Sequence, residues 1–320
     1  MKFKIRTYLL LIVAFITMII VGCFLKQDNN SFSKKVEDKN NIGYLPISRE
    51  VPNISIALLD ESGKVNSNTN YYLNSGEQFE KFINIGNFID LKREFKLITF
   101  IDYEKREFYV DDKLVNDFNF LLDKQEDIQI PIKLPELSRG LHDIIFAIVK
   151  EPNDDLDEQY RRDTEEFHTL YIRFNLTVES EEYNKPSFNF TELTYNNDSA
   201  IPEIFLHENK NELKQLPLIK TKEDKLNLYM TVGNISNSEV KEYVIILLKD
   251  WEIINNSLNN EDKLFLKVNP MEKTTIPLTI DISESGLHNI NAILIENPYQ
   301  KIKFGSVKII NSIRAGVIKE

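Results

Sequence analysis

The chain has 320 residues, a single cysteine and a formal net charge of −11 at pH 7. The acidic balance excludes the basic footprint that nucleic-acid-binding proteins need, and one cysteine excludes a disulfide framework or a cysteine-rich metal site. Because 42% of the residues are hydrophobic and 11% are aromatic, most of the chain can bury a core, and its length suits two domains.

The first 25 residues show the pattern of an export signal. Residues 1–7 carry three basic side chains and no acid, and an uncharged stretch follows over residues 8–25. This stretch contains Ile-Val-Gly-Cys at residues 20–23, which resembles the lipobox of bacterial lipoproteins: aliphatic, permissive, small, then cysteine. The resemblance implies cleavage between Gly22 and Cys23, with Cys23 becoming a lipid-bearing first residue that is held in the membrane by acyl chains such as palmitate.

An uncleaved single-pass anchor helix is the alternative, in which Cys23 is an ordinary apolar residue. The uncharged stretch of 18 residues falls at the short end of a spanning helix, which needs ~17–25 residues. The basic N-terminus stays in the cytoplasm by the positive-inside rule. Both alternatives therefore place the remainder on the extracytoplasmic side of the cell membrane. Residues 23–50 are polar and lack an apolar period, so we expect a flexible tether.

Two related halves make up the rest of the chain. Phe-Ile-Asn-Ile-Gly-Asn at 82–87 corresponds to Tyr-Met-Thr-Val-Gly-Asn at 229–234, an offset of 229 − 82 = 147. Further blocks recur in the same order at nearly the same offset, among them Gly-Leu-His at 140–142 and 286–288. This order predicts a tandem duplication of one domain. The predicted boundaries are a signal or anchor at 1–22, the tether at 23–50, copy 1 at 51–180, a linker at 181–201 and copy 2 at 202–320.

The recurring blocks have the pattern of β-strands. Apolar residues alternate over 225–232, which is typical of a half-buried strand, and 243–248 is nearly all apolar, which favours a central strand. Pro131 and Pro277 fall within expected strands, so those strands should be unpaired on one side or bulged there. With no convincing helical period after residue 30, the prediction is all-β: two tandem immunoglobulin-like antiparallel β-sandwiches after an N-terminal signal or anchor helix and a flexible tether.

The order of these blocks has a counterpart among bacterial surface modules. Each copy has a Gly-Asn turn, a strand ending in Asp-Tyr-Glu (102–104) or Asp-Trp-Glu (250–252), and a Gly-x-His-x-Ile strand. This order resembles the cell-adhesion-related domain found in bacteria (CARDB), in which an acidic loop follows the last of these strands. Copy 2 departs from it, since 296–300 has no acidic run. The resemblance implies a spacer or adhesive module.

The acidic loop of copy 1 is a candidate calcium site. Hard oxygen ligands crowd this loop, and Ca²⁺ takes six to eight oxygens. The candidate ligands are Asp154, Asp155, Asp157 and Glu158. The loop lacks the Asp-x-Asp-x-Asp-Gly spacing of a calcium loop, so the alternative is a solvated hairpin tip that is neutralised by the arginines at 161–162.

Other residues that could carry chemistry recur at equivalent positions. His142 and His288 could bind a metal or an acidic ligand, or could cap a strand locally; no histidine spacing supports a metal site. Tyr103 and Trp251 suit core packing better than a carbohydrate platform. Nucleophile elbows, phosphate loops and dinucleotide fingerprints are absent from the sequence, so we expect no catalytic residue and no cofactor.

These features predict a non-catalytic binding, adhesion or scaffolding protein of the cell surface. Its expected partners are the membrane, through the N-terminus, and a surface protein or polysaccharide; nucleic acid is not expected. The alternatives are the substrate-binding lipoprotein of a transporter, which would need α/β lobes, and an accessory subunit of a cell-wall-active complex.

Overall fold

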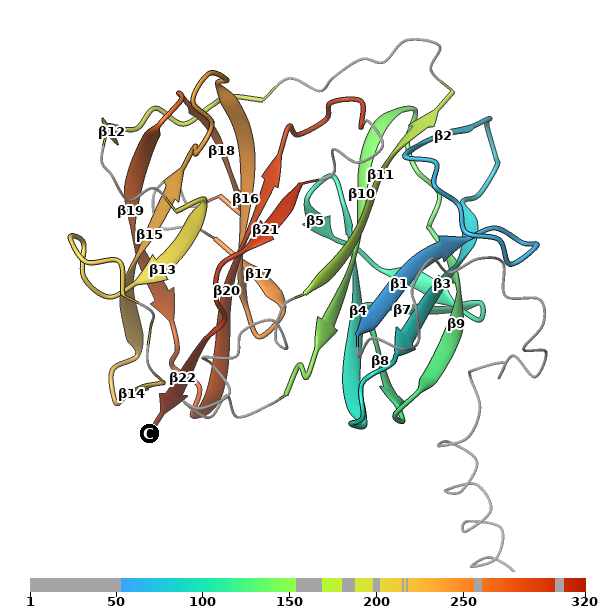
Figure 1. Ribbon diagram of the computed structural model, residues 1–320, viewed down its shortest axis with the longest axis horizontal. Coiled ribbons are helices and arrows are strands. Elements are labelled where there is room, and N and C mark those ends of the chain that lie inside the picture. The colour runs from blue at the N-terminus through green and yellow to red at the C-terminus, as the bar shows by residue number, and fades with distance from the viewer. Residues whose placement is uncertain are drawn as a thin grey trace, which may run out of the picture. The chain divides into compact units, whose positions relative to one another are not determined.

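The structure is a computed structural model that describes residues 53–153, 169–179, 188–197, 202–214, 216, 218–255, 261–302 and 308–320. Every regular element in these ranges is a β-strand, which confirms the all-β prediction (Figure 1). None of the described segments forms a helix that could cross a membrane. The lipobox-like residues, the tether at 23–50 and the candidate calcium ligands lie outside the described ranges.

Copy 1 folds into two sheets. The first has the order β1 (Ile54–Leu59), β3 (Glu80–Asn87), β9 (Glu126–Lys133), β6 (Phe108–Val110) and β7 (Lys113–Val115). The second has the order β2 (Asn70–Leu73), β11 (Leu170–Val178), β10 (Gly140–Lys150), β4 (Arg93–Ile101) and β5 (Glu104–Lys105), with β8 (Asp117–Leu122) paired to β4.

Copy 2 repeats this plan. Its first sheet has the order β12 (Asn196–Asn197), β19 (Glu272–Asp281), β15 (Lys225–Gly233) and β13 (Ile204–His207). Its second sheet has the order β14 (Ile219–Thr221), β22 (Ala315–Lys319), β20 (Gly286–Glu296), β16 (Lys241–Lys249) and β17 (Glu252–Ile254). On this second sheet β18 (Lys263–Val268) pairs with β16, and β21 (Ile309–Asn311) pairs with β20.

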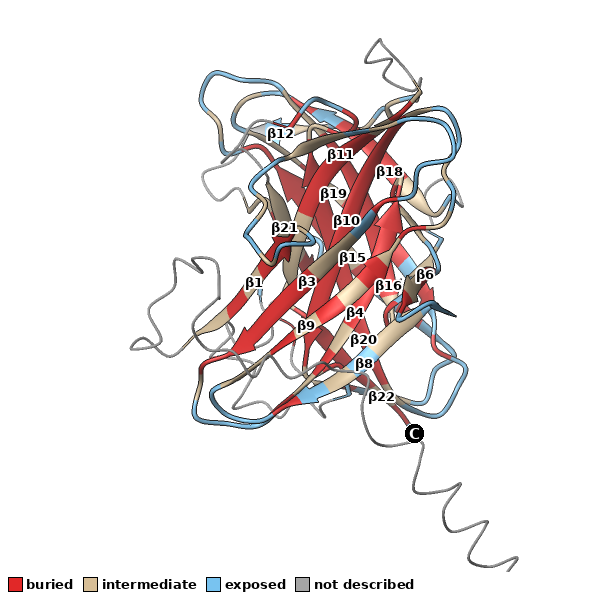
Figure 2. Cartoon of the chain, turned by 90° about the vertical axis from the view of Figure 1, so that its right-hand side faces the viewer, coloured by how far each residue is buried: buried red, intermediate tan, exposed pale blue. Residues whose placement is uncertain are grey.

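The shared strand order is immunoglobulin-like. In each copy three neighbouring antiparallel strands form the centre of the second sheet: β4, β10 and β11 in copy 1, and β16, β20 and β22 in copy 2. A short strand from earlier in each copy, β2 or β14, pairs in parallel with β11 or β22. All other pairings of the named strands are antiparallel. The two sheets of each copy enclose one apolar core, because alternate residues of each strand point inward. Figure 2 shows buried residues along the strands and exposed residues in the loops.

Both prolines within strands lie where a paired strand is present on one side only. Pro131 of β9 pairs with β3, while the pairing of β9 with β6 covers only residues 132–133. Pro277 of β19 pairs with β15, and β12 reaches only residues 272–273. Proline lacks an amide hydrogen, so the unpaired side costs no ladder bond.

A third apolar core lies between the copies. Outward-facing residues of β4 and β10 in copy 1 meet outward-facing residues of β16 and β20 in copy 2, so both second sheets are buried on two faces. From copy 1 come Ile98, Phe100, Tyr103, Leu141, Ile145, Ala147 and Val149, and from copy 2 come Val244, Ile246, Leu248, Trp251, Phe265, Ile293, Ile295 and Tyr299. Phe188 of the linker stacks on Phe265 at 4.2 Å between ring centroids, so this part of the linker packs on copy 2. The described residues from Asn53 onward thus belong to one compact unit with three apolar cores.

Candidate functional site

At the contact between the copies, each copy donates hydrogen bonds from an arginine to backbone carbonyls of the other copy. Arg173 of copy 1 donates to the carbonyl oxygens of residues 296 and 297 in copy 2, at 2.7 and 3.1 Å. Arg314 of copy 2 donates to the carbonyl oxygens of residues 150 and 151 in copy 1, at 3.3 and 2.9 Å. These carbonyl pairs are equivalent in the repeat, since 296 − 150 = 146 and 297 − 151 = 146. Each copy therefore holds the end of the other copy's long strand, β20 or β10, in the same way.

The repeated aromatic position extends this exchange. The hydroxyl of Tyr103 accepts a hydrogen bond from the backbone N–H of Tyr299 at 3.0 Å, and Nε1 of Trp251 donates to the carbonyl of Pro152 at 3.0 Å. Contacts in which i touches j and j touches i are the mark of an approximate two-fold axis. The copies consequently run antiparallel, with the end of β4 against the end of β20 and the end of β16 against the end of β10.

A buried ion pair lies on the copy 1 side of this contact. Arg173 binds Asp143 through two hydrogen bonds, Nε–Oδ1 at 2.9 Å and Nη2–Oδ2 at 2.6 Å, and Tyr103 donates to Oδ2 of Asp143 at 2.6 Å. Burial would lower the pKa of Arg173, but the Asp143 carboxylate outweighs it and raises that pKa. Burial, followed by the charge of Asp143, raises the pKa of Tyr103 well above its usual value. The arginine therefore stays charged and the phenol neutral, an arrangement suited to holding the copies together.

The repeated histidines are pinned locally. Nδ1 of His142 lies 2.7 Å from Oδ2 of Asp102, and Nε2 lies 2.8 Å from the carbonyl of Ser138. His288 repeats this geometry with Asp250 at 2.7 Å and the carbonyl of Glu284 at 2.7 Å. Thus the histidines cap their strands, which agrees with the local alternative. Within the described ranges no cluster of three His, Cys, Asp or Glu side chains could hold a metal ion.

The pKa of His142 depends on its partner Asp102 as well as on burial. Burial lowers the pKa of His142, but the hydrogen bonds that the imidazole donates to the Asp102 carboxylate and the Ser138 carbonyl, together with the charge of Asp102, raise it. Asp102 and Tyr103 both have left-handed backbones (φ 55° and 67°), the conformation of a tight hairpin turn, and this turn aims the carboxylate at the histidine.

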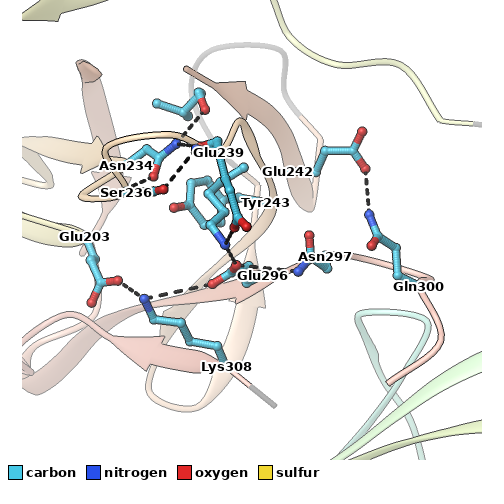
Figure 3. Close-up of polar contacts among 12 residues, drawn as sticks. Glu203, Asn234, Ser236, Glu239, Glu242, Tyr243, Glu296, Asn297, Gln300 and Lys308 are labelled. Carbon is cyan, nitrogen blue, oxygen red and sulfur yellow. Dashed lines mark hydrogen bonds and ion pairs between the residues drawn. The ribbon is translucent and has the colours of Figure 1, made fainter. Parts of the chain in front are cut away.

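A second charged cluster surrounds Glu296 at the end of β20 (Figure 3). This nearly buried carboxylate lies 2.6 Å from Nζ of Lys241 and 3.9 Å from Nζ of Lys308. Lys308 also pairs with Glu203, and Lys241 with Glu239 at 2.9 Å. The hydrogen bonds that Lys241 donates to Glu296 and then to Glu239 raise the pKa of Lys241. Each lysine lies between two carboxylates, so three acids share two cations.

Two surface cavities lie on copy 1. One, of about 230 Å³, has a floor formed by Phe79, Leu134 and Val178 and a rim that includes Arg139 and Glu77. Its size suits one large side chain or sugar substituent rather than a whole cofactor.

The second cavity, of about 260 Å³, lies on the outer face of the first sheet. It is lined by Phe82, Tyr109 and Pro131, with Asp111 and Asp112 at its edge. Burial, followed by the charge of Asp112, raises the pKa of Asp111. The lining also includes Lys81 and Lys133, and Nζ of Lys133 lies 5.9 Å from the centroid of the Tyr109 ring. An aromatic floor rimmed by charges of both signs is suited to a hydroxyl-rich group of a partner.

Several predicted site residues lie outside the described ranges. These are Gly22, Cys23, Asp154, Asp155, Asp157 and Glu158, so lipidation and calcium binding stay predictions. Sequence reasoning missed the Arg173–Asp143 pair. Its signal was a lone cation in the otherwise apolar run Leu-Tyr-Ile-Arg-Phe at 170–174.

Comparisons with known proteins give no family assignment. No family model matches the chain, and no curated protein matches it. Solved structures that resemble it include the CARDB domain of a Pyrococcus furiosus protein in complex with di-metal ions, with 12% identity, 44% of this chain and 98% of that chain covered, and a TM-score of 0.25. They also include red sea bream transglutaminase (10% identity, 86% and 32% covered, TM-score 0.24). A third is the C-terminal domain of a Streptococcus agalactiae AgI/II polypeptide (9% identity, 83% and 100% covered, TM-score 0.24). At such scores the fold assignment rests on the strand order given above.

Proposed function

We propose that the chain is an exported, membrane-anchored surface protein that acts as a non-catalytic binding, adhesion or scaffolding module. The observation that carries the proposal is the buried reciprocal contact, which joins two sandwiches into one unit. The charged groups at that contact are paired: Arg173 binds Asp143 and backbone carbonyls, and the Glu296 carboxylate binds Lys241, which suits structural roles. The export pattern of residues 1–25 and the lipobox-like position of Cys23 support the membrane location.

The surface of copy 1 supports a binding role. Its two cavities combine apolar floors with polar rims, which is the make-up of sites that receive a side chain or a sugar. A surface protein or a polysaccharide is therefore the proposed partner. The transporter alternative needs helices around a cleft, whereas the described residues form strands.

The anchor is tested by changing Cys23→Ala in the full chain. We expect loss of labelling by a palmitate analogue and retention of residues 1–22, because the lipidated thiol precedes cleavage in lipobox proteins. The measurement is lipid labelling together with the mass of the N-terminal peptide. Labelling that survives the change would show that Cys23 is not the lipid attachment point.

The binding role is tested with residues 38–320 against purified surface polysaccharide and surface protein from the same cells. We expect saturable binding to one of them, weakened by Tyr109→Ala in the larger cavity. Leu114→Ala, an exposed change outside that cavity, serves as the control. Absence of saturable binding to both materials would contradict the binding role.

A further inference from the structure

The loops at one end of copy 2 expose three apolar side chains. Residues 235–240 join β15 to β16, and residues 269–271 join β18 to β19. On these loops Ile235, Val240 and Met271 are 52%, 46% and 46% exposed. We refer to these three side chains as the copy 2 tip.

The backbone holds the tip together. The N–H of Met271 donates to the carbonyls of Asn234 and Ser236, at 3.0 and 3.1 Å, and so lies beside Ile235. The side chain of Asn234 donates to the carbonyl of Glu239 at 2.7 Å, next to Val240. Figure 3 shows Asn234, Ser236 and Glu239 close to one another at this end of copy 2. The apolar side chains are therefore presented on ordered turns.

The equivalent loops of copy 1, residues 88–92 and 123–125, are charged. They carry two ion pairs that cross from one loop to the other: Lys92–Asp123 at 3.2 Å and Lys124–Asp90 at 3.1 Å. Such pairs keep a loop end hydrated, as is usual for an exposed turn.

Copy 2 has lost these charges. By the offsets of the repeat, Val240, Asn269 and Pro270 stand where copy 1 has a lysine, an aspartate and a lysine. The one charged residue left in the longer loop is Glu239, which is paired with Lys241 at 2.9 Å. In a chain that is 28% charged, these two loops carry a single charged residue.

The Gly-Asn pairs were wrongly predicted as turns: Gly86 and Asn87 are the last residues of β3, and Gly233 is the last residue of β15. The copies also differ in where the apolar residue after this pair points. Phe88 in copy 1 is 2% exposed, and Gln125 donates to its carbonyl at 2.8 Å. The equivalent Ile235 is exposed, and Met271 takes the place of the glutamine. Gln125 and Met271 share a left-handed backbone (φ 60° and 58°), so the turn is the same and only the side chain has changed from polar to apolar.

We propose that the copy 2 tip inserts into the surface of a lipid bilayer. The three side chains lie on convex turns, so a soft apolar phase can cover them all at once, and leaving water stabilises each of them. The asparagine and serine residues beside them can hydrogen-bond in the interfacial layer. Because no basic cluster accompanies the tip, binding does not need anionic lipid. The presence of a bilayer rests on the proposed function; the insertion rests on the tip alone.

Vesicle flotation of residues 38–320 tests the insertion. We expect this part to float with pure phosphatidylcholine vesicles, and the triple variant Ile235→Ser, Val240→Ser, Met271→Gln to lose at least ~10-fold in partition coefficient. Leu91→Ser, which removes a 59% exposed apolar side chain from the copy 1 loops, should leave the coefficient unchanged. An unchanged urea midpoint shows that each variant is folded.

Two further readouts make the test specific. Since residues 38–320 contain no cysteine, Met271→Cys carries a single environment-sensitive dye, which should shift to the blue on adding vesicles, whereas Lys124→Cys in copy 1 should not. Raising the salt to 1 M should not weaken partitioning. Failure of the wild type to float, an equal dye shift at both positions or a steep loss with salt would each overturn the proposal.

These outcomes are separate from those for the anchor. Residues 38–320 lack Cys23, so flotation does not depend on lipidation. Flotation with an unlipidated Cys23 would leave the tip standing and remove the lipid anchor, and lipidation without flotation would do the reverse.

Discussion

Replacing Arg173 by methionine should destabilise the contact between the copies strongly. The guanidinium makes two hydrogen bonds to Asp143 and one to each of two carbonyls of copy 2, and the side chains of both ionic partners are almost fully buried. Removing one partner of a buried pair leaves an uncompensated charge, which costs about 3–5 kcal/mol. This equals about 150- to 5,000-fold in the folding equilibrium constant.

The measurement is urea unfolding of residues 38–320 at pH 7, with the free energy of unfolding compared between wild type and Arg173→Met. A second variant, Arg173→Met with Asp143→Asn, removes both charges and keeps an oxygen for the hydroxyl of Tyr103. We expect it to regain at least half of the loss, because most of the cost is the stranded carboxylate. Lys92→Met breaks an ion pair whose partners are 54% and 67% exposed, and should cost less than about 1 kcal/mol.

The reasoning is refuted if Arg173→Met costs no more than Lys92→Met. It is refuted as well if the double variant is less stable than Arg173→Met alone, since the stranded carboxylate could not then be the cause.

Further predictions concern a strand glycine, a titrating histidine and a buried tryptophan. Gly86→Ala should cost about 1–3 kcal/mol in urea unfolding, because the new Cβ would lie 2.5 Å from the ring of Phe88. Since Asp102 raises the pKa of His142, the stabilisation is full below about pH 6.5 and is lost as pH rises through the folded-state pKa. The wild type should thus lose stability relative to His142→Asn as the pH rises above about 6.5, and parallel pH profiles would contradict this. Trp251→Phe removes the indole N–H donor and should lower the free energy of unfolding by about 1–2 kcal/mol. An unchanged urea midpoint would show that the hydrogen bond to copy 1 does not stabilise the fold.

The strands could be read from the sequence because each has a strong periodic pattern. In β15 the alternating Leu226, Leu228, Met230 and Val232 are all buried, as a period of two predicts. The run 243–248 was expected to be central because it is nearly all apolar. Both faces of β16 are apolar because one face packs in the core of copy 2 and the other packs against copy 1.

The contact between the copies could not be read in the same way. Asp143 and Arg173 are brought together by the register of β10 and β11, in which residues 30 apart in the chain become neighbours. The reciprocal arginine contacts depend on carbonyl groups, which every residue has and no motif marks. Repeated histidines suggested a shared chemistry, whereas each one is satisfied by an aspartate of its own copy.

The approximate two-fold axis gives the unit two unlike ends. Ile54 pairs with Asn87, so the chain enters copy 1 beside the loop that follows β3, while the equivalent loop of copy 2 carries the apolar tip at the opposite end. The long strands β10 and β20 have 11 residues each, or about 35 Å at the rise of an extended chain. The two copies therefore do not present one doubled face toward a single flat partner. The start of copy 1 and the apolar tip of copy 2 lie at opposite ends of the unit, so a partner bound at the tip would be held away from the side on which the chain enters.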